Sequence, residues 1–227
     1  MVQIKDRLGK VLFERSDSDF SDVNLELVDL QGANLSNLNL SCAKLSNASL
    51  SGVSCYVVDF SDADLSEADL RGADFFRSDL TNANLYCADL RGAEFYDNSN
   101  LTNSSLRGVD LRGAEFHGVN LSNADLRDAS LRGATILSCN LSCVNLIGAN
   151  LIGVNLEDTN LTGANLYKTD LRGANLKGAN LTGANLFEVD LRGANLEGAN
   201  LTGANLTGAN LIGATLTGSN LTGANCN

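Results

Sequence analysis

Side chains able to perform acid–base, nucleophilic or metal chemistry are scarce in this chain of 227 residues. His117 is its one histidine, and no cysteine or second histidine lies near it in the sequence. A catalytic triad or a zinc centre needs such groups side by side. Acidic residues are numerous, but they recur at a fixed spacing, as Asp64 and Asp69 do, and so belong to a repeat. We therefore expect no enzymatic activity, no bound metal and no cofactor.

The six cysteines are predicted to be free thiols, since they form no CxxC pair and no zinc-binding spacing. Three fall at positions expected to face inward, where cysteine behaves as a small hydrophobic residue, and three fall at expected corners. These are Cys55, Cys139 and Cys226, followed by Cys42, Cys87 and Cys143. The first residues lack an apolar signal core, and no apolar run approaches the length of a membrane span. Together these features favour a cytoplasmic location.

The element that positions all these side chains is a five-residue repeat. A large apolar residue, almost always leucine, recurs at every fifth position from Phe20 to Cys226. A period of five fits neither an amphipathic helix nor a flat strand, so the chain must turn at regular intervals around a common axis. This pattern is typical of a β-solenoid. A small residue two before each leucine is expected inside, and glycine two after it is expected at a corner.

The tandem units read A(D/N)LxG, most clearly in ANLKGANLTG at residues 174–183, and they resemble those of pentapeptide-repeat proteins. The resemblance covers residues 16–227. It implies an all-β fold, a right-handed quadrilateral β-helix of about ten coils with leucine inside. It implies no single activity for the family.

Two places depart from the repeat. Residues 1–15 alternate like two strands around a turn at 6–10, which predicts a β-hairpin that caps the first coil. A one-residue insertion near 97–100 is expected to bulge at a corner while the coil stays four-sided.

Read at a period of 20 residues, which is one predicted coil, the sequence shows four different walls. One wall carries arginine with an aspartate two residues earlier, as in Asp69 and Arg71. Coils stacked about 4.8 Å apart would bring these charges into columns. We interpret them as a ladder of exposed ion pairs, with a docking strip for carboxylates or polyanions as the alternative.

The most individual wall combines outward aromatic residues with carboxylates. The outward residues in successive coils are Tyr56, Phe76, Tyr96 and His117, which we call the aromatic strip. Beside them lie Asp74, Glu94 and Glu115, which we call the acidic flank. Stacked aromatic side chains can simply stabilise one another. A contiguous apolar strip edged with charge also marks many interaction surfaces, so this wall is the candidate partner-binding site.

Charge is concentrated in the same half of the chain. Residues 1–100 contain 17 acidic and 8 basic residues, a net charge of −9, whereas residues 101–227 contain 10 and 8, a net charge of −2. Such a surface repels nucleic acid and anionic membranes and attracts a basic partner. We predict a rigid scaffold that binds a protein partner, without direct contact to nucleic acid or membrane.

The resemblance also implies a second possible function. Some family members, the fluoroquinolone-resistance proteins, resemble a DNA duplex in width and charge and bind DNA gyrase. The alternative is therefore a DNA-mimicking inhibitor of gyrase, although the arginine column and the nearly neutral second half weigh against it. The repeat also runs to Cys226 without a cap, which implies either a homodimer through the last coil, as in relatives that pair end to end, or a frayed end.

Overall fold

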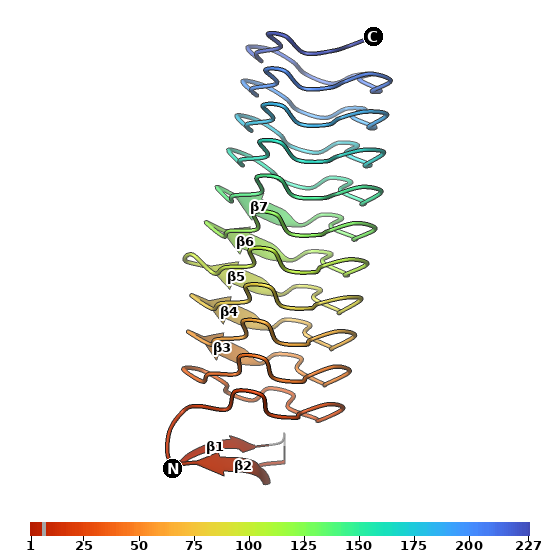
Figure 1. The fold of residues 1–227 in the computed structure, drawn as a ribbon. Helices are drawn as coiled ribbons and strands as arrows, with labels where there is room; N and C mark the ends of the chain where they lie inside the picture. Colours follow the sequence, from red (N-terminus) through yellow and green to blue (C-terminus); the bar gives the residue numbers. More distant parts are fainter. Residues whose placement is uncertain (6–7) are drawn as a thin grey trace.

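The computed structural model describes residues 1–5 and 8–227, and Figure 1 shows them as a tall stack of coils above a two-stranded sheet. The sheet consists of β1 (Val2–Lys5) and β2 (Val11–Arg15), which pair antiparallel with Val2 opposite Arg15. The turn predicted at 6–10 includes residues 6 and 7, which lie outside the described residues. Ile4 of β1 is buried in the same apolar core as the coils, so the sheet covers the beginning of the stack.

Each coil is joined to the next by parallel bridges between residues 20 positions apart, or 21 where the bridge spans the insertion near 97–100. Four consecutive bridges, five residues apart, start at Asp19, Asn24, Asp29 and Asn34, so four ladders run along the stack. The N–H of each central residue donates to a carbonyl of the following coil, as from Leu25 to Lys44 at 2.7 Å. Across the described residues no helix forms, and the protein is an all-β solenoid, a β-helix. No described segment could cross a membrane as an apolar helix.

The core is filled by the central residues and by the small residues two positions before them. Leucines such as Leu70 and alanines such as Ala73 are fully buried. Among the described residues, five buried side chains carry a hydroxyl group, and each donates to a carbonyl oxygen, as Ser99 does to Phe75 and Thr159 to Ile136, both at 2.9 Å. All six cysteines are free thiols. Burial raises the pKa of Cys139 to about 11, which makes this thiol unreactive.

The corners explain the glycine pattern. The residue two after each centre has a positive φ, whether it is glycine, such as Gly178 at 66°, or another residue, such as Val57 at 55°. A side chain at Gly178 would also collide with Asp158, since its Cβ would lie 2.2 Å from Oδ1. Positive φ strains a β-branched residue most, so Val57 stands at an unfavourable corner.

One wall has longer strands than the others. It is a five-stranded parallel sheet in the order β3 (Ser54–Tyr56), β4 (Asp74–Phe76), β5 (Glu94–Tyr96), β6 (Glu115–His117) and β7 (Thr135–Leu137). The middle residue of each strand points into the core and its two neighbours face out. Aromatic and β-branched residues favour extended backbone, which is consistent with continuous pairing at this wall.

The extra residue near 97–100 is held at one corner of that wall. Asp97 and Asn98 both have positive φ, at 54° and 70°, where other corners have one such residue. The next position, Ser99, is fully buried, and Asn100 pairs with Asp79, a separation of 21 residues. The ladder then returns to its ordinary spacing with Asn100 opposite Asn120.

Candidate interaction surface

The sheet β3–β7 brings the aromatic strip and the acidic flank into register. Tyr56 lies opposite Phe76, Phe76 opposite Tyr96, and Tyr96 opposite His117. The flank is aligned in the same way, with Asp74 opposite Glu94 and Glu94 opposite Glu115. All seven predicted residues therefore lie on one outer face.

The aromatic strip consists of two stacked pairs. The ring centroids of Tyr56 and Phe76 are 4.6 Å apart with an interplanar angle of 23°. Those of Tyr96 and His117 are 5.0 Å apart with an angle of 16°. The guanidinium of Arg77 lies 5.1 Å from the centroid of Phe76, and its Nε is 2.5 Å from Asp97 Oδ2. Arg77 is thus part of this surface, which its repeat position alone did not indicate.

Glu115 joins the acidic flank to the second aromatic pair. The Tyr96 hydroxyl donates to Glu115 Oε2 at 2.9 Å, and Nε2 of His117 lies 3.7 Å from the same oxygen. The pKa of Tyr96 is well above its ordinary value, because of partial burial first and the hydrogen bond to Glu115 second. The carboxylate of Glu94 raises it further. Tyr96 therefore stays a neutral hydrogen-bond donor at physiological pH.

Much of this surface is open to solvent. Tyr56 is 45% exposed, Phe76 and Tyr96 are half-buried, and Glu94 and Glu115 are exposed. The surface can offer ring faces to an apolar or cationic group and carboxylates to a basic one. Among the described residues, no group of three or more histidine, cysteine or acidic side chains is placed to hold a metal ion.

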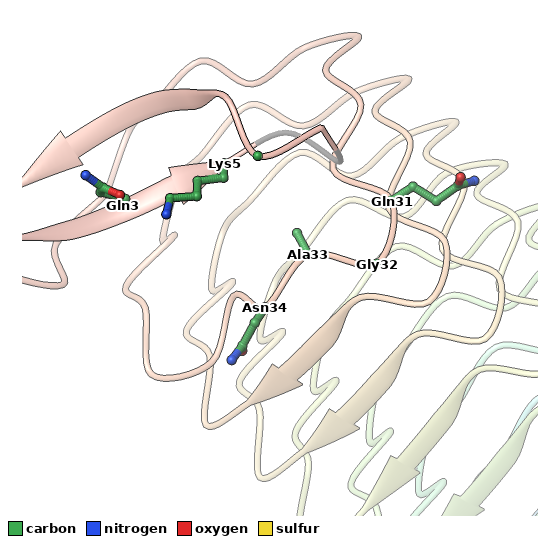
Figure 2. Close-up of a pocket in the computed structure, with 7 residues that line it drawn as sticks. Gln3, Lys5, Gln31, Gly32, Ala33 and Asn34 are labelled. Carbon is green, nitrogen blue, oxygen red and sulfur yellow. The ribbon is translucent and has the colours of Figure 1, made fainter.

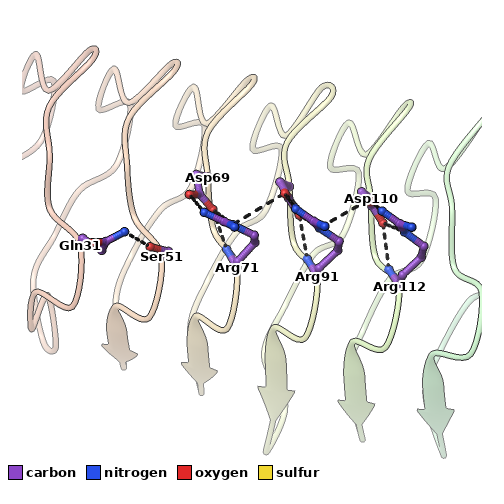
Figure 3. Close-up of polar contacts among 8 residues, drawn as sticks. Gln31, Ser51, Asp69, Arg71, Arg91, Asp110 and Arg112 are labelled. Carbon is purple, nitrogen blue, oxygen red and sulfur yellow. Dashed lines mark hydrogen bonds and ion pairs between the residues drawn. The ribbon is translucent and has the colours of Figure 1, made fainter.

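The adjacent wall carries the ion-pair ladder, which Figure 3 shows as a row of side chains above the strands. Asp69 accepts hydrogen bonds from Arg71 Nε at 2.7 Å, from Nη2 at 2.6 Å and from the backbone N–H at 3.3 Å. Arg71 Nε also lies 3.8 Å from Asp89 of the next coil. The same pattern within a coil recurs in Asp89–Arg91, Asp110–Arg112, Asp170–Arg172 and Asp190–Arg192.

One further ion pair lies outside the predicted column of aspartate and arginine. Asp125 and Arg127 form the same arrangement, with Nη2 2.5 Å from Oδ2, but they belong to the preceding column. The two-residue spacing between aspartate and arginine was the available signal, and it would have identified this pair in any column.

Acid should weaken the ladder. Hydrogen bonds from the paired arginines hold the pKa of Asp69, Asp110, Asp125, Asp170 and Asp190 below the ordinary value of 3.8. Their contribution to stability is therefore complete above pH 3.8 and is lost as the pH falls below it. We expect the melting temperature to drop below this pH, and to drop less for Arg112→Gln. A drop equal in both proteins would contradict the assignment.

A pocket lies between the N-terminal sheet and the first coils (Figure 2). Its volume is about 300 Å³, and it is lined by Gln3, Lys5, Gln31 and the backbone around Gly32. Among the described residues, Lys5 supplies its one charged side chain. Within the described residues this lining contains no histidine, cysteine or carboxylate side chain.

The sequence matches the family model for pentapeptide repeats over residues 16–54, 59–95, 97–134, 139–178, 166–203, 179–218 and 199–227. Among solved structures, it is similar to HetL from the cyanobacterium Nostoc, a pentapeptide repeat protein involved in the regulation of heterocyst differentiation. The two share 36% identity with a TM-score of 0.84, covering 92% of this chain and 91% of HetL. Among curated proteins, none matches the sequence.

Two further structures are similar over a smaller extent or with a lower score. Rfr23, a pentapeptide repeat protein from Cyanothece, shares 38% identity with a TM-score of 0.24, covering 48% of this chain and 64% of Rfr23. The plasmid-mediated fluoroquinolone resistance protein QnrB1 shares 22% identity with a TM-score of 0.44, covering 85% of this chain and 91% of QnrB1.

Proposed function

Because the chain belongs to the pentapeptide-repeat family, we propose that it is a non-enzymatic scaffold that binds a protein partner through the aromatic strip. The scaffold is a right-handed, four-sided rod of about ten coils that acts in the cytoplasm. The observation that carries this proposal is the exposed strip, held in register by the four parallel strands β3 to β6 and edged by three carboxylates. The involvement of HetL in regulation supports a role that depends on binding.

The chemistry of the surface indicates what the partner presents. The acidic flank lies in a half of the chain with a net charge of −9, so complementarity favours a segment with lysine or arginine beside an apolar side chain. The contact between Arg77 and Phe76 shows, within the chain itself, that a ring of the strip accepts a guanidinium. The partner is therefore a basic protein segment and not nucleic acid or an anionic membrane.

A DNA-mimicking inhibitor of gyrase is the second candidate. It is favoured by an excess of negative charge between Asp59 and Asp97, where the sequence has ten carboxylates and three arginines. Asp69 and Asp89 of this group are nevertheless neutralised by their own arginines, which interrupts the anionic surface. A supercoiling assay with purified gyrase separates the two functions, since a scaffold of the proposed kind neither inhibits gyrase nor protects it from drugs.

The strip can be tested with a triple variant. Replacement of Tyr56, Phe76 and Tyr96 by serine is expected to weaken binding to basic, apolar peptides on an array at least tenfold. The fold should persist, because two stacked pairs contribute about 0.5–1.5 kcal/mol each. Binding and thermal unfolding are measured on the same samples.

The matched control removes three outward aromatic residues away from the strip, Tyr86, Tyr167 and Phe187. This control is expected to bind as the unaltered protein does. If the strip variant instead loses most of its stability and retains binding, the strip is a structural ladder and the proposal fails. Capture of acidic peptides that is lost in the strip variant would also contradict it, because such binding would take place at the strip.

A further inference from the structure

Each coil that contributes an arginine to the ion-pair ladder forms one step of it. At one step the arginine has no aspartate two residues before it. Ser130 stands where the other arginine-bearing coils have aspartate, and Arg132 follows it at the usual spacing. In the next coil the corresponding residue is Asn150, which also carries no charge. Among the described residues, Arg132 forms no hydrogen bond and no ion pair.

The neighbouring step shows what the serine removes. Asp110 receives three donors from Arg112: the backbone N–H at 3.2 Å, Nε at 2.9 Å and Nη2 at 2.6 Å. It is also approached from the preceding coil by Arg91 Nε at 3.7 Å. At the next step the same three donors of Arg132 have no acceptor in the part of the chain that the structure describes, and Arg112 lacks the contact that Arg91 has with Asp110.

The short side chain of Ser130 lies in a hollow of about 420 Å³ that is also lined by Arg112, Asp128, Arg132 and Asn150. The carboxylates of the hollow have partners already. Asp110 pairs with Arg112, and Asp128 lies 3.5 Å from Arg107 Nε. Arg132 is exposed, and its charge is the one in the hollow that no carboxylate of the described chain offsets.

We propose that this step binds a carboxylate side chain, aspartate or glutamate, of a protein partner in the place that Asp110 takes one coil earlier. A guanidinium and a backbone N–H together match the two oxygens of a carboxylate, as the intact steps demonstrate. A phosphate dianion fits less well, because Asp110 and Asp128 lie in the same hollow. The site is independent of the aromatic strip, whose acidic flank attracts cations.

The test follows arginine resonances by NMR in ¹⁵N-labelled protein at low ionic strength. The probes are acetate, inorganic phosphate and a blocked tripeptide with a central aspartate, each compared with chloride at equal ionic strength. Acetate and the tripeptide are expected to shift the backbone and Nε–Hε signals of Arg132 saturably, while those of Arg71 stay in place. Phosphate should bind more weakly than acetate.

Two variants of Ser130 make the result decisive. Ser130→Asp supplies the carboxylate from within the chain, so the Arg132 signals should begin at the shifted position and the affinity for acetate should fall at least tenfold. Ser130→Ala leaves the step without a carboxylate and should bind acetate within twofold of the unaltered protein. The proposal is overturned if Arg132 responds no more than Arg71, or if Ser130→Asp still binds. Tighter binding of phosphate, or acetate binding without tripeptide binding, overturns the assignment to a protein side chain.

Discussion

Phe95→Ala is expected to lower the free energy of unfolding by about 3–5 kcal/mol. Phe95 is fully buried between two other rings, with centroids 4.6 Å from Phe75 and 4.7 Å from Phe116, and the three rings are nearly parallel. Backbone hydrogen bonds hold the coils at a fixed spacing, so the walls cannot collapse into the space that the ring leaves. The cost therefore includes a cavity as well as the lost burial. Denaturant unfolding followed by circular dichroism measures it.

The residue that follows provides the matched control. Tyr96 is also aromatic and stacked, but its ring lies on the outer face. Tyr96→Ala removes a surface pair, which contributes about 0.5–1.5 kcal/mol, and leaves no internal cavity. Equal losses for the two variants would show that the rod is not stabilised mainly by its interior at this wall.

The contrast between these neighbouring residues also marks how far the sequence predicts the structure. The five-residue period predicts which residues are inside, because in a solenoid a given repeat position has the same environment in every coil. It does not predict how outward side chains arrange themselves. The 20-residue pattern places the four rings in one column, but within that column Tyr56 stacks with Phe76 and Tyr96 with His117. Outward rotamers respond to local partners, here Arg77 beside Phe76 and Glu115 beside Tyr96.

The ion-pair ladder shows the same limit. The spacing of aspartate and arginine predicts charged columns but leaves open which pairs are strongest. In the structure the pair within a coil is close, 2.6 Å for Arg71 and Asp69, whereas the contact to the next coil is 3.8 Å. The carboxylate of Asp69 also accepts the backbone N–H of Arg71, which fixes it on its own coil. This backbone hydrogen bond favours the pair within the coil over the pair between coils. The pattern of residue types alone does not predict it.

Deletion of a single asparagine is expected to change stability little at the corner of Asn98 and to reduce it strongly at the corner of Asn103. Without Asn98, the corner retains one residue of positive φ, Asp97, as the corners at Arg77 and Gly118 do. The ion pair of Asp97 with Arg77 remains available. The spacing from Asp79 to Asn100 would return to 20 residues, so we expect the melting temperature to change by less than about 5 °C, a shift that corresponds to roughly 1–2 kcal/mol.

Deletion of Asn103 should instead disrupt the fold around it. Asn103 has a positive φ of 59° and lies at a corner, but it belongs to an ordinary five-residue unit, and its N–H donates to Ser122 at 3.1 Å. Its removal leaves four residues where the turn needs five, so either Leu101 or Leu106 must leave the core. Each fully buried leucine contributes about 1.5–3 kcal/mol, and the unpaired backbone groups add to the cost. Thermal unfolding of the two deletions compares them directly. Equal destabilisation by the two deletions would contradict the expectation and would mean that Asn98, although it is the extra residue, stabilises the fold.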